Sequence, residues 1–104
     1  MITEIRHYSK WATTKDMSIG IGSDSRNPNA TRLHIPKGTT LTWDDDSASG
    51  NVWFYVIIDG KQERGKIECG RITNLIKTGD IELIDNGDGL RAYAGDFLQK
   101  LLNN

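Results

Sequence analysis

Apolar and polar residues alternate along several short segments of this chain. Met17, Ile19 and Ile21 are each separated by one small residue, and Leu41 and Trp43 repeat this spacing. A period of two places alternate side chains on one face of a β-strand, so the pattern indicates half-buried strands. On this basis we predict strands over residues 17–22, 31–35, 39–43, 61–69 and 79–84, with residues 2–8 as a further candidate.

Residues 52–58 are apolar at consecutive positions, which predicts the most deeply placed strand. Its even-numbered side chains would lie on one face, and Trp53, Tyr55 and Ile57 on the other. A strand that is apolar on both faces either lies at the centre of a sheet or uses its second face for binding. The face that carries Trp53 is therefore a candidate surface.

Glycine-containing turns separate these strands. Asp59-Gly60 is typical of a type I′ hairpin, in which both central residues need a positive φ. Pro36 and Gly38 predict a tight turn before the next strand, because proline fixes its own φ and glycine accepts a positive one. Gly65, within the strand that follows the hairpin, predicts a bulge or a sharp bend.

The C-terminal part of the chain has a helical period instead. Its apolar residues recur at spacings of three and four, which places them in one stripe along a helix. The stripe contains Leu90, Tyr93, Ala94, Phe97, Leu98, Leu101 and Leu102. We predict an amphipathic helix over about residues 89–102 with Asp88 as its N-cap. The stripe either caps the end of a barrel, which would leave the protein a monomer, or forms the seam of a weak dimer through Phe97, Leu98 and Leu101, or binds a partner protein.

Length and composition limit the architecture to one domain. The chain has 104 residues, of which 37% are hydrophobic, enough for one small core. We place that domain over residues 1–104, with a barrel core at about 17–84. Residues 70–75 are expected to form a turn or a single helical turn. The expected fold class is thus mainly β, a small barrel of five to six strands followed by the C-terminal helix.

Charge and cysteine content bear on the partners and the compartment. Thirteen basic and 14 acidic residues give a net charge of -1, which argues against a dedicated nucleic-acid coat or a polybasic membrane anchor. The single cysteine, Cys69, cannot form an intrachain disulfide, which favours a reducing compartment. Glu4, Arg6 and His7 stand where a signal peptide would be apolar. We therefore expect a cytoplasmic protein with no membrane contact.

A longer pattern over residues 35–76 resembles the bacterial Src-homology-three-type barrel. The matching positions are Pro36, Gly38 and Thr39 of a P-x-G-T turn, Trp53 and Val56 of a W-x-x-V strand, and Gly65 and Ile67 of a G-W-V-like strand. Lys66 stands where this family usually places Trp. The resemblance implies a barrel of five or six strands that binds peptides, glycan-linked peptides or proteins.

The run Asp44, Asp45 and Asp46 precedes the aromatic strand. In Src-homology-three-type barrels an acidic loop often flanks the aromatic groove. Carboxylates beside aromatic rings suit a peptide that carries Lys or Arg, through charge pairing and stacking. We therefore expect a peptide-binding surface at Trp53 and Tyr55, edged by the three carboxylates.

Basic residues concentrate at Lys61, Arg64, Lys66, Arg71 and Lys77, of which Arg64, Lys66 and Arg71 are the three candidate site cations. Arg64 and Lys66 would edge the aromatic surface on the side opposite the acidic run. If the three cations share a face with Tyr55, they would form a platform for nucleic acid. The other interpretation is a set of solvated cross-strand pairs with glutamates.

The candidate residues for metal binding and for nucleophilic catalysis do not have the spacing that such sites require. The acidic run has neither the alternate ligands nor the closing carboxylate of a calcium loop. His7 and His34 have no further ligands at zinc spacing, and no serine lies in a nucleophile elbow. We expect no metal, no cofactor and no enzymatic activity.

The expected function is that of a non-enzymatic protein-interaction domain, such as a small phage-type inhibitor or regulator of a host protein. The expected partner is a protein or a peptide. The alternative is a nucleic-acid-binding barrel that uses Arg64, Lys66 and Arg71. A third hypothesis is a small enzyme or a protein that sequesters a small ligand.

Overall fold

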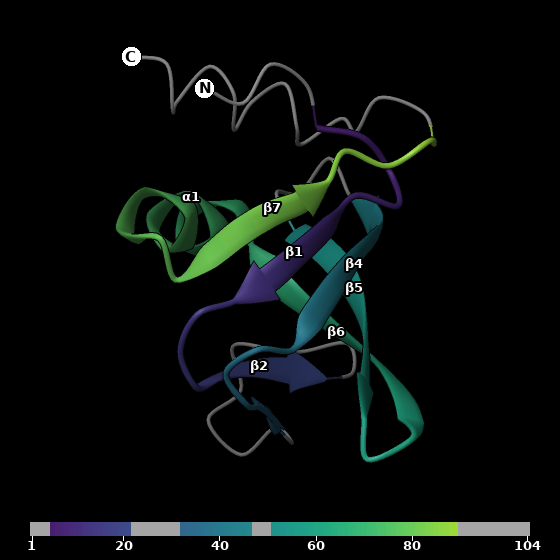
Figure 1. The fold of residues 1–104 in the computed structure, drawn as a ribbon, viewed down its shortest axis with the longest axis vertical. Helices are drawn as coiled ribbons and strands as arrows, with labels where there is room; N and C mark the ends of the chain where they lie inside the picture. Colours follow the sequence, from purple (N-terminus) through teal and green to yellow (C-terminus); the bar gives the residue numbers. More distant parts are fainter. Residues whose placement is uncertain (1–4, 22–31, 47–50, 90–104) are drawn as a thin grey trace.

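The computed structural model describes residues 5–21, 32–46 and 51–89, and Figure 1 shows their arrangement. The strands are β1 (Lys10–Thr13), β2 (Met17–Ile21), β3 (Arg32–Ile35), β4 (Thr40–Asp46), β5 (Asn51–Ile58), β6 (Lys61–Glu68) and β7 (Ile81–Asp85), and the helix is α1 (Cys69–Thr78). All strand pairs are antiparallel, in the order β3-β2-β6-β5-β4-β1-β7. The protein is mainly β, as the alternation predicted.

The centre of the sheet is the meander of β4, β5 and β6. β5 pairs with β6 along its whole length, from Asn51 opposite Glu68 to Ile58 opposite Lys61. β1 lies between β4 and β7, and the β2–β3 hairpin joins the other side of β6. In the described part of the chain no pairing joins β3 to β7, so the sheet is not closed. Its seven strands exceed the five to six that we expected.

The two predicted turns have the backbone geometry that their residues favour. Asp59 and Gly60 have φ angles of 53° and 78°, which confirms the prediction of two left-handed residues in the β5–β6 hairpin. Gly38 has a φ of 86°, and the Thr39 amide donates to the Pro36 carbonyl at 3.2 Å. Gly38 therefore occupies the third position of that turn, where a type II turn needs a positive φ.

The core is enclosed by the inward side chains of the sheet and by α1. On β5, Val52, Phe54 and Val56 are buried, whereas Trp53 and Tyr55 on the opposite face are half-buried. The core consists of Ile5, Trp11, Met17, Ile19, Ile35, Leu41, Trp43, Val52, Phe54, Val56, Ile67, Cys69, Ile72, Leu75 and Ile81. The predicted division of β5 into an inner and an outer face is thus confirmed, and Trp43 belongs to the core.

Helix α1 is longer than the turn or single helical turn that we predicted over residues 70–75. It runs for ten residues and buries Cys69, Ile72 and Leu75, which recur every three residues along one face. Gly79 ends it with a φ of 77° and donates its amide to the Ile76 carbonyl. Tertiary burial therefore extends a segment whose glycine and threonines are weak helix formers.

The first strand lies later in the chain than we predicted. Of residues 2–8, the described part is not a strand, and β1 begins at Lys10. Tyr8 has a φ of 69°, which turns the chain before β1, and its amide donates to the Trp43 carbonyl at 2.7 Å. The alternation in β1 was missed because only Trp11 among its four side chains is large and apolar.

The bulge predicted at Gly65 is absent from the β5–β6 pair, where Gly65 lies opposite Phe54 in unbroken register. A register shift occurs instead in β4, between Trp43 and Asp45. The amphipathic helix predicted over residues 89–102 lies outside the described residues apart from Gly89. Within the described part of the chain, no helix is long and apolar enough to cross a membrane.

Candidate binding face

The register of the central strands brings most of the predicted site residues onto one face. Trp53 of β5 lies opposite Lys66 on one side and Asp45 on the other. Tyr55, two residues further along β5, lies opposite Arg64 and Thr42. Residues directly opposite in neighbouring strands share a face, so these side chains form two adjacent rows outside the core.

Trp53 is covered by cations of its own chain. The Arg64 Cζ atom lies 4.4 Å from the ring centroid of Trp53, and the Lys66 Nζ atom lies 5.5 Å from it. Both distances suit a cation–π interaction, in which the positive charge is attracted to the ring face. A ligand cation stacked on this ring, as expected from the sequence, would therefore compete with Arg64 and Lys66.

Asp44, at the bulge in β4, lies within reach of Arg64. Because two residues of a bulge face one residue of the partner strand, Asp44 and Asp45 both lie beside Trp53. The Arg64 Nε atom donates to Asp44 Oδ2 at 3.0 Å, and Nη2 lies 3.0 Å from the same oxygen. Asp44 thus holds the guanidinium over the ring. Asp46 lies opposite Val52 at the end of β4.

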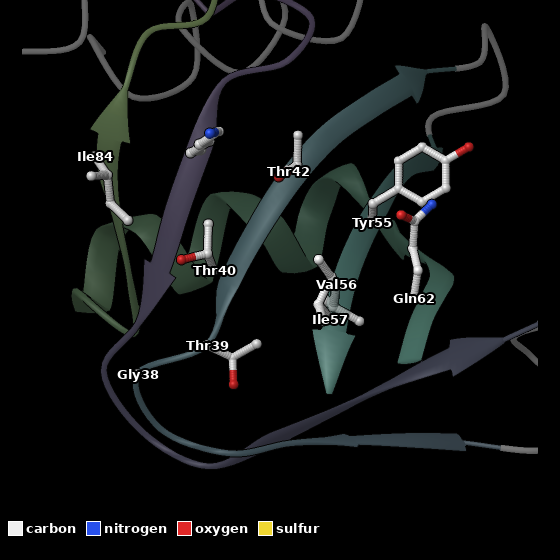
Figure 2. Close-up of a pocket in the computed structure, with 10 residues that line it drawn as sticks. Gly38, Thr39, Thr40, Thr42, Tyr55, Val56, Ile57, Gln62 and Ile84 are labelled. Carbon is white, nitrogen blue, oxygen red and sulfur yellow. The ribbon is translucent and has the colours of Figure 1, made fainter. Parts of the chain in front are cut away.

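A groove runs over the outer face of the sheet next to this cluster (Figure 2). It has a volume of about 730 Å³ and is lined by Lys10, Gly38, Thr39, Thr40, Thr42, Tyr55, Val56, Ile57, Gln62 and Ile84. These residues come from β1, β4, β5, β6 and β7 and from the turn before β4. Tyr55 contributes to both the groove and the row beside Trp53, so the two features are continuous.

Two side chains make the groove unusual for a solvent-facing surface. Ile57 is 66% exposed and Ile84 is 58% exposed, and together with Tyr8 they are the exposed large hydrophobic residues of the described part of the chain. Both line the groove, with the hydroxyls of Thr40 and Thr42 from β4 lining it as well. The groove therefore offers apolar contacts with a few hydrogen-bonding groups, a composition typical of binding sites.

The groove was not recognised from the sequence. Alternation places Ile57 on the same face as Trp53, but no local pattern in the sequence indicates Lys10, Thr40, Thr42 or Ile84. Ile84 reaches this surface only because β7 pairs with β1 and β1 pairs with β4. The detectable signal was Ile57 itself, a large apolar residue on the outward face of a hairpin strand.

Arg71 is not brought to the Trp53 cluster by any pairing or contact that the structure records. It is half-buried in the first turn of α1, and burial, together with the positive charge of Arg32, lowers the pKa of its guanidinium. The basic residues Arg64 and Lys66 share a face as predicted, whereas Arg71 belongs to helix α1.

Among the described residues, no group of three histidine, cysteine or carboxylate side chains is arranged to hold a metal ion. Cys69 is buried at the start of α1. A comparison of the chain with protein-family models, curated proteins and solved structures gave no significant match.

Proposed function

We propose that this protein is a non-enzymatic interaction domain that binds a protein partner through the groove and the adjoining Trp53 cluster. The observation that carries the proposal is that Ile57 and Ile84, on β5 and β7, are exposed and line one groove. Exposed apolar side chains gathered in one concavity favour binding, because a partner removes them from water.

The surroundings of the groove support a protein partner. Tyr55 and Trp53 present half-buried aromatic rings, and Arg64 lies over one of them. Tyr, Trp and Arg are the residues most enriched where protein interfaces gain their affinity. Charged residues such as Lys10 and Asp44 lie around this apolar area, which matches the polar rim of an interface.

An Src-homology-three-like architecture is part of the proposal. Its support is the order of elements: a tight turn before β4, the β4–β5–β6 meander, α1 after β6, and the return of β7 to β1. The resemblance requires this sequence of turn, strand, hairpin, strand, helical segment and last strand. A role as a phage-type inhibitor or regulator would follow if the partner is a host protein whose own surface is blocked.

Selection of peptides from a random library against the immobilised protein tests the proposal, because the selection requires no identified partner. We expect enrichment of a common motif containing apolar residues that suit the groove. The selected peptides should bind the Ile57→Thr variant at least tenfold more weakly, as expected for loss of a contact at an interface centre. Lys77→Gln, an exposed position in the last turn of α1, is the matched control and should bind normally.

The absence of a common motif would argue against a peptide-binding groove. Equal binding of the selected peptides to the wild type and to Ile57→Thr would place the binding surface elsewhere.

A further inference from the structure

Strand β7 forms one edge of the sheet. Within the described part of the chain it pairs with β1 and with no other strand. The Asp80 carbonyl accepts the Thr14 amide at 2.8 Å, so it points toward β1. Backbone groups of successive strand residues point to alternate sides, so those of Glu82 also point toward β1 and those of Leu83 point away from it. No hydrogen bond from another part of the described chain reaches the amide or carbonyl of Leu83.

Ile84 connects this open edge to the groove. It has no residue directly opposite it in β1, because the register shifts between Leu83 and Asp85. Its side chain is 58% exposed and lines the groove, and Figure 2 shows it on β7 at the border of the groove. A chain segment laid along the edge of β7 would therefore cover Ile84 and reach the groove.

Glu82 gives this edge a negative charge. Its side chain is exposed on the outer face of the sheet, because the buried Ile81 before it points to the core. The residue opposite Glu82 in β1 is Ala12, which carries no charge, and no ion pair between described residues includes Glu82. The other carboxylate of β7, that of Asp85, has Lys10 opposite it. Glu82 is therefore the carboxylate of β7 with which a bound basic side chain would pair.

We propose that the partner of the groove binds as an extended segment that adds a strand to the open edge of β7. The inference rests on the proposed function, since it specifies how that partner binds. The segment would exchange backbone hydrogen bonds with Leu83. It would place an apolar side chain beside Ile84 and, two positions away on the same face, a Lys or Arg side chain beside Glu82. A second copy of this chain fits less well, because its β7 carries two carboxylates and no cation.

Amide hydrogen exchange locates the added strand directly. In the free protein the Leu83 amide should exchange faster than the Glu82 amide, which points toward β1. A peptide selected from the random library should slow exchange at Leu83 about tenfold when its concentration is ten times its Kd, because the bound form holds this amide in a hydrogen bond. Methylation of single peptide nitrogens should weaken binding about tenfold at alternate positions only, since every second amide of an added strand points toward β7.

A charge substitution tests the pairing with Glu82. Glu82→Gln should weaken binding of the selected peptides that contain Lys or Arg by about two- to fivefold, the range expected for an exposed ion pair. Raised salt should remove this difference, because it screens exposed charges. Glu68→Gln is the matched control, since Glu68 is an exposed glutamate at the end of β6 whose side chain makes no cap hydrogen bond to α1. It should bind as the wild type does.

Four outcomes separate this inference from the proposed function. Slow exchange of Leu83 in the free protein would overturn the strand addition. Peptide binding that is weakened by Ile57→Thr but leaves Leu83 exchange unchanged would also overturn it, while the proposed function would stand. Protection of Leu83 with normal binding by Ile57→Thr would support the strand addition and remove the groove. Concentration-dependent dimerisation that protects Leu83 would assign the edge to a second copy and overturn the proposal.

Discussion

Arg64 and Asp44 lie on strands separated by β5, yet the Arg64 Nε atom donates to Asp44 Oδ2 at 3.0 Å. The guanidinium reaches this oxygen by passing over Trp53, whose ring centroid is 4.4 Å from the Arg64 Cζ atom. The contact lies at the bulge in β4, where Asp44 stands between Trp43, which is opposite Phe54, and Asp45, which is opposite Trp53. One ion pair thus fixes the charged edge of the proposed interface.

The Asp44–Arg64 ion pair should fix the position of the Arg64 side chain over Trp53 but contribute little to the stability of the fold. Both side chains are partly exposed, so Asp44→Asn should lower the free energy of unfolding by no more than about 1 kcal/mol. Because Trp11 and Trp43 are buried, Trp53 is the tryptophan accessible to solvent. Asp44→Asn should release the Arg64 guanidinium from the Trp53 ring, so we expect acrylamide to quench more of the tryptophan fluorescence in this variant than in the wild type.

Asp59→Asn is the matched control for that experiment, because asparagine is favoured in the same turn and the residue lies away from Trp53. It should leave both stability and quenching unchanged. If acrylamide quenches the fluorescence of the two variants to the same extent, Asp44 does not hold the Arg64 guanidinium over the Trp53 ring.

Substitutions on the two faces of β5 should differ strongly in how much they lower the stability of the protein. Phe54 is fully buried and its ring lies 5.5 Å from that of Trp43, edge to face, so Phe54→Ala should cost about 3–5 kcal/mol. Ile57 is exposed, and Ile57→Thr keeps a β-branched side chain, so it should change stability by no more than about 0.5 kcal/mol. Urea unfolding of both variants measures the difference, and similar losses would mean that Ile57 is covered in the native protein.

Two glycines should respond to alanine with opposite signs. Gly60 has a φ of 78° in the hairpin turn, so Gly60→Ala should destabilise the protein by about 1–2 kcal/mol. Gly70 lies in α1, and no neighbouring atom lies within 4 Å of where an alanine Cβ would stand, so Gly70→Ala should stabilise the protein by about 0.5–1 kcal/mol. Thermal unfolding distinguishes the two, and stabilisation by Gly60→Ala would contradict the left-handed turn.

Because of the Lys15–Asp80 pair, the stability of the protein should decrease as the pH falls in the acid range. Hydrogen bonds from Lys15 and Thr78 lower the pKa of Asp80 below its usual value. A carboxyl group whose pKa is lower in the folded state contributes stability above its unfolded pKa of about 3.9, and this contribution is lost as the pH falls through the folded pKa. The difference in melting temperature between wild type and Asp80→Asn should therefore shrink below about pH 4.

Lys15→Met should reproduce the effect of Asp80→Asn, and the double variant should be no less stable than either single one. Additive losses from pH 5 to pH 7 would show that Asp80 is not stabilised through Lys15.

Much of the central sheet could be predicted because its signals are local. The Asp59-Gly60 turn sets a two-residue hairpin, which by itself places Trp53 opposite Lys66 and Tyr55 opposite Arg64. The alternation of residues 52–56 then separates the buried face from the outer one. These two local features account for the correct grouping of the aromatic and basic residues.

The remainder depends on contacts between distant parts of the chain. The groove forms only where β7 joins β1, a pairing between residues about 70 positions apart that no local pattern encodes. Likewise, α1 is held by burial of Cys69, Ile72 and Leu75 and not by helix propensity, and the bulge at Asp44 has no glycine to mark it. Proximity in sequence suggests that Arg71 lies with Lys66, whereas the fold places Arg71 in helix α1.

The central claim is that the groove beside Tyr55 is the binding surface. Its most direct test is amide chemical-shift mapping of the protein with a peptide selected from the random library. The account predicts that the largest shifts fall on Thr40, Thr42, Tyr55, Ile57 and Ile84 and that Ile57→Thr needs at least a tenfold higher peptide concentration to reach the same shifts. Shifts confined to α1 or to the β2–β3 hairpin, with the groove unaffected, would contradict it.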